Sequence, residues 1–473
     1  MVFSSSIFLF YFLPIALLLY YIVPARFRNL TLVLESIFFY TWGAPKYIFV
    51  VLGAMLVDFF LAKKIHNSEG NAKKRYLVLA LSINIGALLY FKYFNFFIEN
   101  INDIIFSLGF TPHNFLKVAL PIGISFFTFH EISYLVDVYR AKKMPFKKIT
   151  DYALYILFFP QLIAGPIIRF NEISDQIANN NAPISYESRL IGFFRFLIGL
   201  SKKILIANVC GAKADLIFSL PVSDLSTSIA WIGALAYTFQ IYFDFSGYSD
   251  MAIGLARMMG FVFPENFNNP YVSQNITEFW RRWHMTLSRW IRDYLYISLG
   301  GNKVSAKRTY VNLVICFLIS GFWHGAEWTF IFWGAYHGLF LILDRLFLIK
   351  LLSKFGKLGS ILFTFFITII GWVFFRSNSI VVASSYLKKM FSLSSSNYTL
   401  LLNKEFVFTM FLAVFFSFFT LPTAGQIVQN NLFDPKPSVK LFATLSLVSI
   451  LLIVVLAGAI VSTDFNPFIY FRF

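Results

Sequence analysis

The stretch that decides the fold class is residues 309–345, TYVNLVICFLISGFWHGAEWTFIFWGAYHGLFLILDR. It is almost wholly apolar, and its two histidines, His324 and His337, lie inside the apolar run. A helix needs roughly 20 mostly apolar residues to cross the hydrocarbon core of a bilayer. Comparable runs recur from the first residues to residue 461. We therefore expect an all-α polytopic membrane protein.

Composition points the same way. Of the 473 residues, 58% are hydrophobic, 20% aromatic and only 13% charged, against about 25% charged residues in soluble proteins. No separate soluble domain is visible, so we expect residues 1–473 to form a single integral membrane domain. The two cysteines, Cys210 and Cys316, lie far apart in apolar surroundings. They offer neither a disulfide framework nor a CxxC metal motif, and we expect no metal.

The net charge of +17 has a membrane explanation rather than a nucleic-acid one. The basic residues gather in short loops beside apolar runs, chiefly residues 62–75 and 140–148, as the positive-inside rule predicts. We therefore expect contact with membrane lipid and no nucleic-acid partner. Part of the excess charge is suited to steering an anionic, phosphate-bearing ligand.

Loop charges also give a topology. Residues 62–75 are predicted to be cytoplasmic, which places the N-terminus and the C-terminal tail outside. The first run, residues 7–23, lacks a basic n-region and a cleavage site, so it reads as a retained helix rather than a signal peptide. In total we predict about eleven spans plus re-entrant pieces. The clearest are 29–42, 48–61, 76–97, 116–138, 309–345, 360–375, 406–421 and 441–461, with a cytoplasmic loop at 423–440 and broken helices across 150–305.

The strongest candidate for chemistry is His324, within ISGFWHGAEWT at residues 319–329. Gly321 and Gly325 flank it and permit close approach of backbone or ligand, while Trp323 and Trp328 offer apolar walls. An imidazole that titrates near neutral pH can accept the proton of a hydroxyl as that hydroxyl attacks a thioester. The residues alone leave a catalytic and a structural role equally open.

The other histidines have simpler interpretations. His66 and His113 lie in polar loops and are expected to be solvated. His130 and His337 lie inside predicted helices, where a buried imidazole is usually a hydrogen-bonded packing element.

A second candidate is the segment NITEFWRRWHMTLSRWIRDYLY at residues 275–296. If this segment is one helix, a single face carries Thr277, Trp280 and His284. Arg281 and Arg282 supply charge beside that face, and guanidinium groups are well suited to binding phosphates. The alternative is an amphipathic helix anchored at the membrane interface by Trp and Arg.

Four motifs together resemble the membrane-bound O-acyltransferase family. They are residues 126–140, QIYFDFSGYSDMAIG at 240–254, the 280–296 block and GFWHG at 321–325. The opening MVFSS and the order of the motifs resemble the alginate O-acetyltransferase branch of that family, and the resemblance covers essentially the whole chain.

The resemblance implies a helical shell around a funnel that meets a tunnel at mid-membrane, with acyl-CoA entering from the cytoplasm. It implies that His324 is catalytic and that His284 is its second polar partner. Trp280, Arg281, Arg282 and Trp323 are then expected to bind the donor, acetyl-CoA. The expected acceptor is an extracellular or periplasmic polysaccharide such as alginate or peptidoglycan, reached with the help of an external acetyltransferase partner, at the bacterial inner membrane.

The C-terminal FIYFRF, residues 468–473, resembles the tail of the small companion peptide of teichoic acid D-alanylation systems. There a tyrosine is a proposed acyl carrier, which by position makes Tyr470 an acyl relay. A phenol has a pKa near 10, so its ester is a better acyl donor than a sugar ester. An aromatic tail packed at the membrane interface is the competing interpretation.

Two further functions remain open. The first is a D-alanyl transferase for teichoic acid, fed by a carrier protein. The second is a polytopic transporter or flippase with broken helices around a substrate site, which would need no histidine base.

Overall fold

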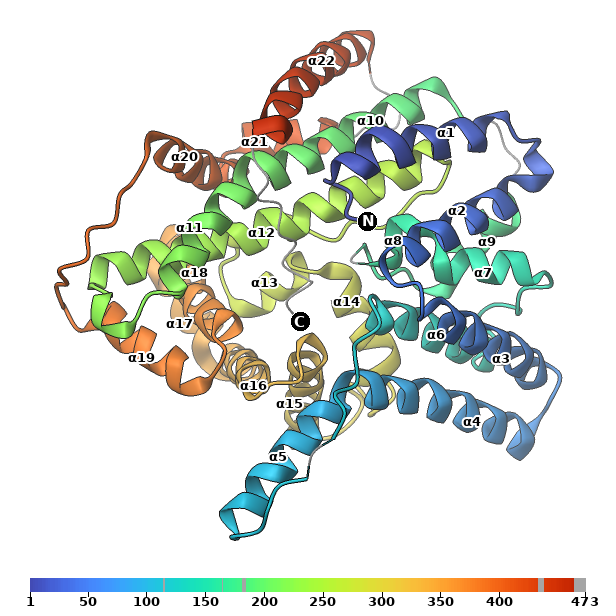
Figure 1. Ribbon diagram of the computed structural model, residues 1–473, viewed down its shortest axis with the longest axis horizontal. Helices are drawn as coiled ribbons and strands as arrows, with labels where there is room; N and C mark the ends of the chain where they lie inside the picture. The colour runs from blue at the N-terminus through green and yellow to red at the C-terminus, as the bar shows by residue number, and fades with distance from the viewer. Residues whose placement is uncertain (114, 164, 181–183, 433–437, 463–473) are drawn as a thin grey trace. The chain divides into compact units, whose positions relative to one another are not determined.

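The computed structural model describes residues 1–113, 115–163, 165–180, 184–432 and 438–462. Its secondary structure is helical, with no β-strand in these ranges (Figure 1). The all-α prediction is therefore confirmed for the described residues. Two compact units can be distinguished, unit 1 with Met1–Met1, Ile7–Ile184 and Met259–Phe263, and unit 2 with Val2–Ser6, Ser185–Met258 and Pro264–Phe473. That residues 1–473 form a single domain stays a prediction.

Unit 1 is built from mostly apolar helices. Their bounds are α1 Leu13–Ile22, α2 Arg28–Gly43, α3 Ile48–His66, α4 Gly70–Leu88, α5 Phe94–Ser107, α6 Ile124–Tyr139, α7 Ile149–Leu157, α8 Phe159–Leu162 and α9 Phe170–Ala178. Helices α3, α4 and α6 pack on one another. The amide of Asn84 on α4 donates to both carboxylate oxygens of Asp58 on α3, at 3.0 and 2.9 Å, which satisfies polar groups that would be costly to bury alone.

Helix α6 begins later than the sequence predicts. The predicted span 116–138 is non-helical up to Gly123, among the residues described there, and α6 starts at Ile124. Gly123 has a φ of 79°, in the left-handed region that favours glycine, and a Cβ there would lie 2.8 Å from the carbonyl oxygen of Leu162. His130 on α6 has the expected structural hydrogen bond, since the backbone N–H of Ile168 donates to its Nε2 at 3.4 Å.

Unit 2 contains the segments of highest functional interest. Its helices are α10 Tyr186–Ser201, α11 Asn208–Phe218, α12 Thr227–Met258, α13 Ile276–Arg282, α14 Met285–Trp290, α15 Ala306–His324, α16 Trp328–Leu343, α17 Ile349–Leu352, α18 Gly356–Arg376, α19 Ile380–Phe391, α20 Lys404–Phe418, α21 Thr423–Leu432 and α22 Val439–Ser462. The π-helical turns η4 Lys202–Ala207, η7 Ile291–Tyr296 and η8 Asp344–Leu348 continue α10, α14 and α16. Helix α21 occupies part of the predicted loop 423–440, so that prediction is wrong for those residues.

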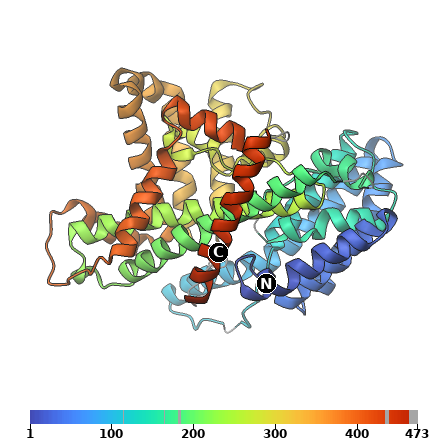
Figure 2. The same cartoon turned by 90° about the horizontal axis from the view of Figure 1, so that it is seen from above.

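Helices α10 and α12 lie side by side with their backbones in close contact (Figure 1 and Figure 2). A Cβ at Gly199 would lie 2.5 Å from the carbonyl oxygen of Gly247, and one at Gly254 would lie 2.5 Å from that of Gly192. Gly192 and Gly199 on α10 are seven residues apart, and so are Gly247 and Gly254 on α12. Residues at this spacing lie on one face of a helix. Small residues on facing sides let two helices approach closely.

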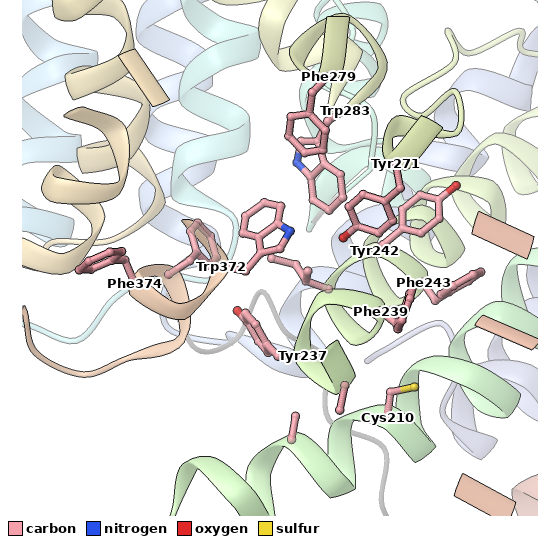
Figure 3. Packing of buried hydrophobic residues seen from close by; sticks show 14 of the residues in the cluster. Cys210, Tyr237, Phe239, Tyr242, Phe243, Tyr271, Phe279, Trp283, Trp372 and Phe374 are labelled. Atoms are coloured by element: carbon pink, nitrogen blue, oxygen red, sulfur yellow. The ribbon is translucent and has the colours of Figure 1, made fainter. Parts of the chain in front are cut away.

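The core of unit 2 is aromatic. Figure 3 shows Phe279 and Trp283, from α13 and the turn after it, packed towards Tyr271 and Trp372. The rings of Trp283 and Trp372 are 4.9 Å apart, and those of Phe279 and Trp283 are stacked at 5.6 Å. These contacts fix the short helix α13 against α18, and therefore fix the residues that follow α13.

Three helical stretches of the described residues are long and apolar enough to cross a membrane. They are Gly70–Ser107, Trp328–Arg376 and Val439–Val461. The pair Lys404–Phe418 and Thr423–Leu432, bent by 87° at its break, would make a fourth. These stretches fit a helical membrane protein, whereas the count of about eleven spans and the outside placement of both termini stay predictions.

Candidate active site

His324 is the last residue of α15, at a break between two closely packed helices. The run 309–345, predicted as a spanning stretch, consists of two helices, because Gly325 and Glu327 are extended and α16 begins only at Trp328. Gly321 on α15 and Gly334 on α16 allow the two backbones to approach closely. A side chain at Gly321 would collide with the carbonyl oxygen of Phe330, and a Cβ there would lie 3.1 Å from the Cα of Gly334. The break therefore puts His324 at the end of a tight helical hairpin.

Aromatic rings from three helices surround the imidazole of His324. Its ring centroid is 4.8 Å from that of Trp323, 5.2 Å from that of Trp333 and 5.2 Å from that of Phe375. Only 7% of His324 is exposed. Such apolar walls exclude bulk water, which strengthens electrostatic interactions made inside the site.

His284 lies at a second break, and this corrects the prediction of one helix over 275–296. Helix α13 ends at Arg282, α14 begins at Met285, and His284 between them has a φ of 44°, in the left-handed region. Thr277 and His284 therefore do not lie on one face of a single helix. The backbone N–H and hydroxyl of Thr277 instead donate to Oδ2 of Asp344, at 2.7 and 2.8 Å, which anchors the start of α13.

The indole ring of Trp323 contacts the rings of both histidines. The ring of Trp323 lies 4.8 Å from that of His324 and 6.3 Å from that of His284. His284 also packs edge-on against Phe245 of α12, at 4.7 Å, and is 1% exposed. The structure thus brings His284 of the 280–296 block together with Trp323 and His324 of the GFWHG motif in one cluster of unit 2.

The three other predicted donor-binding residues have different surroundings. Trp280 is buried and its ring lies 5.5 Å from that of Trp333, so it belongs to the same aromatic cluster. Arg282 forms an ion pair with Glu278 at 2.9 Å, and its Nη1 donates to the carbonyl of Asn268 at 3.1 Å. Arg281 is exposed. Binding of the donor by these residues stays a prediction.

His337, expected to be a hydrogen-bonded packing residue, is walled by aromatic rings. Its ring lies 5.1 Å from those of both Trp280 and Trp333. Among the residues that the structure describes, neither of its ring nitrogens has a hydrogen-bond partner. The expected hydrogen bond is therefore not found in the described residues.

Buried ion pairs join helix α12, which contacts His284 through Phe245, to α10 and η4. Asp244 pairs with Lys203 at 2.9 Å, and both side chains are almost fully buried. Asp250 pairs with Lys202 at 2.6 Å and accepts from Nη2 of Arg195 at 2.8 Å. These pairs tie α12, which carries Phe245, to α10 and η4.

Sequence reasoning missed Asn266, whose Oδ1 lies 3.0 Å from Nδ1 of His284. An asparagine in a polar loop is a common turn residue, so no local signal distinguishes it. Tyr470, the predicted acyl relay, lies outside the described residues. Both cysteines, Cys210 and Cys316, are buried as free thiols.

Comparison with known proteins decides the family. Residues 48–396 match the membrane-bound O-acyltransferase family, MBOAT. The chain belongs to this family. MBOAT proteins are membrane-bound acyltransferases by their family description, which agrees with the apolar helices of this chain.

The relatives of this MBOAT protein include enzymes of polysaccharide and wall acetylation. It is 40% identical to the probable alginate O-acetylase AlgI of Pseudomonas putida over the whole of both chains. It is 45% identical to the probable alginate O-acetylase AlgI of Pseudomonas aeruginosa, over 83% of this chain and 75% of the relative. It is 41% identical to the peptidoglycan O-acetyltransferase of Helicobacter pylori, over 83% of this chain and 80% of the relative.

These matches make the protein an O-acyltransferase of the MBOAT family, similar to alginate O-acetylases. The expectation drawn from the four sequence motifs is confirmed at that level. The roles of individual residues, the donor and the direction of transfer go beyond what the matches establish.

Proposed function

We propose that this protein transfers acetyl from cytoplasmic acetyl-CoA to a hydroxyl at the outer face of the bacterial inner membrane. The final acceptor is an extracellular or periplasmic polysaccharide, alginate or peptidoglycan by analogy with the relatives, and an external transferase partner completes the transfer. His324 acts as the general base and His284 as the second polar group of the site.

The observation that carries this proposal is the place of His324. It is a buried imidazole at a helix break, with His284 one indole ring away. The full-length similarity to alginate O-acetylases supports acetyl as the group transferred. The family match favours an enzyme over a transporter, and acyl transfer to a hydroxyl is a reaction that a general base assists.

The chemistry follows from what an imidazole can do. A ring nitrogen of His324 takes the proton of the attacking hydroxyl while the hydroxyl oxygen forms a bond to the thioester carbonyl carbon. The C–S bond then breaks, the acetyl group stays on the oxygen, and the imidazolium returns its proton to the departing thiolate of CoA. The ring contacts of Trp323, Trp333 and Phe375 keep the imidazole in place during both proton transfers.

Replacement of His324 by alanine tests the proposal. In proteoliposomes supplied with acetyl-CoA, His324→Ala should lower the release of CoA by about 100- to 10,000-fold, the usual contribution of a general base. His66→Ala is the matched control, because His66 is exposed at the end of α3. More than a tenth of the wild-type turnover in His324→Ala would rule out the base. Turnover with D-alanyl carrier protein but not with acetyl-CoA would favour the D-alanyl transferase.

Tyr470 is proposed as the relay that receives the acetyl group. Its phenol oxygen is the attacking hydroxyl in the first transfer, and the resulting acetyl-tyrosine ester is the donor for the external partner. Tyr470→Phe should abolish polymer acetylation, whereas Phe471→Leu, its neighbour in the tail, should preserve it. Normal polymer acetylation in Tyr470→Phe would exclude the relay and leave the role of His324 intact.

A further inference from the structure

The ring of His284 is held by a side chain from the loop that precedes α13. Oδ1 of Asn266 lies 3.0 Å from Nδ1 of His284, and the two side chains are 0% and 1% exposed. The two residues are 18 positions apart in the sequence, so the contact is made by the fold rather than by local geometry. Asn266 is therefore placed to set how the imidazole is turned and protonated.

Thr286 shows which end of the Asn266 amide faces the histidine. The backbone N–H and the hydroxyl of Thr286 both meet the same Asn266 atom, at 3.3 and 2.9 Å. A backbone N–H can only donate, so that atom must be the amide oxygen. At the other end, Nδ2 of Asn266 donates to the hydroxyl of Ser249 on α12, at 2.9 Å. The hydrogen-bond network thus fixes the amide in one orientation.

This orientation determines the tautomer of His284. An amide oxygen accepts and cannot donate, so Nδ1 of His284 must carry the ring proton, and in a neutral imidazole Nε2 then carries the lone pair. We propose that Asn266 is a positioning residue that fixes His284 as the Nδ1–H tautomer, so that Nε2 is the ring nitrogen that carries the lone pair and can accept a proton in the acyl-transfer chemistry. The part concerning acyl transfer rests on the function proposed above.

The backbone reinforces this arrangement. The N–H of Met285 donates to the carbonyl of Asn266, and the N–H of Asn268 donates to the carbonyl of Arg282, each at 2.9 Å. These two bonds bracket His284 on both sides and hold it in its left-handed conformation. A residue kept in this sparsely populated region needs such over-determination by its surroundings.

Nitrogen NMR on the intact protein in liposomes tests the tautomer without reference to activity. The chain has only six histidines, and His284→Gln identifies the signals of His284 in a sample labelled with ¹⁵N-histidine. We expect the proton on Nδ1 in the wild-type protein. A proton on Nε2 instead would overturn the proposal, whatever the variants show.

Variants at Asn266 test the cause. Asn266→Leu removes the acceptor, and we expect loss of the Nδ1–H signal and a fall in kcat of about 10- to 100-fold, as for other partners that orient a functional histidine. Asn266→Asp keeps an acceptor oxygen, so it should retain the Nδ1–H signal and recover much of the activity. Asn71→Leu, at an exposed position near the start of α4, is the matched control.

The outcomes separate this proposal from the proposed function. An unchanged His284 spectrum in Asn266→Leu would overturn the role of Asn266. An altered spectrum with normal turnover would support Asn266 as the residue that sets the tautomer, and would remove His284 from the proposed mechanism. If Asn266→Leu fails to fold, the wild-type spectrum and Asn266→Asp still decide between these results.

Discussion

Removing the ammonium group of Lys203 should destabilise the protein by about 3–5 kcal/mol. Nζ of Lys203 lies 2.9 Å from Oδ1 of Asp244, and the two side chains are 2% and 1% exposed. In Lys203→Met the carboxylate of Asp244 remains buried without this cation, and the desolvation of a charge in that position is no longer offset. The cost of keeping this carboxylate buried after it loses the ammonium group of Lys203, rather than the lost attraction, is the origin of the expected loss.

The double variant Lys203→Met/Asp244→Leu separates the two contributions. Replacing a whole buried pair by apolar residues of similar volume is often neutral or stabilising. We therefore expect the free energy of unfolding of the double variant to be several kcal/mol higher than the summed losses of Lys203→Met and Asp244→Leu would give. Unfolding by SDS titration in detergent micelles, followed by the fluorescence of the 9 tryptophans, measures each free energy.

The exposed pair Lys117–Glu99 provides the control, with side chains 80% and 60% exposed. Lys117→Met should change the free energy of unfolding by about 0–1 kcal/mol. If Lys203→Met also falls in that range, or if the double variant is as unstable as the summed single variants, the reasoning about an unpaired buried charge is refuted.

Two further predictions concern packing. Gly199→Ala should lower the free energy of unfolding by about 1–3 kcal/mol, because its Cβ would lie 2.5 Å from the carbonyl oxygen of Gly247. Gly53→Ala is the control and should not lower it, because the space around Gly53 is open. Equal thermal stability of the two variants would contradict the close contact. His337→Phe should change stability by less than about 1 kcal/mol, since an apolar ring replaces an imidazole that has no hydrogen-bond partner among the described residues. A loss above about 2 kcal/mol in the same unfolding assay would show that the imidazole binds water or another polar group.

The sequence was a good guide where the signal is local and apolar. Long apolar runs predicted the helical class. Of the two tryptophans predicted as walls beside His324, Trp323 contacts its ring, whereas Trp328 is 56% exposed; Trp333, which the sequence did not single out as a wall, also contacts it. Helix α15 ends at His324, next to Gly325, but the sequence did not predict a break inside the run 309–345. An apolar run alone does not reveal a break, because both helices of a hairpin have the same composition.

The sequence was a poor guide where long-range hydrogen bonds decide the backbone. The break at His284 depends on bonds from Asn266 and Asn268, which no helical periodicity encodes. The start of α6 depends on the packing of Gly123 against Leu162, far along the chain. In each case a tertiary contact overrides a favourable local pattern.

The contact between Gly321 and Gly334 has a mechanical consequence. Because backbone touches backbone, α15 and α16 have no side-chain layer between them at this point that could yield by changing rotamer. His324 at the end of α15 and Trp333 on α16 should therefore move together as parts of one rigid body. With His324 as the base proposed above, enlarging either glycine would then alter catalysis by moving the imidazole, without contact to any substrate atom.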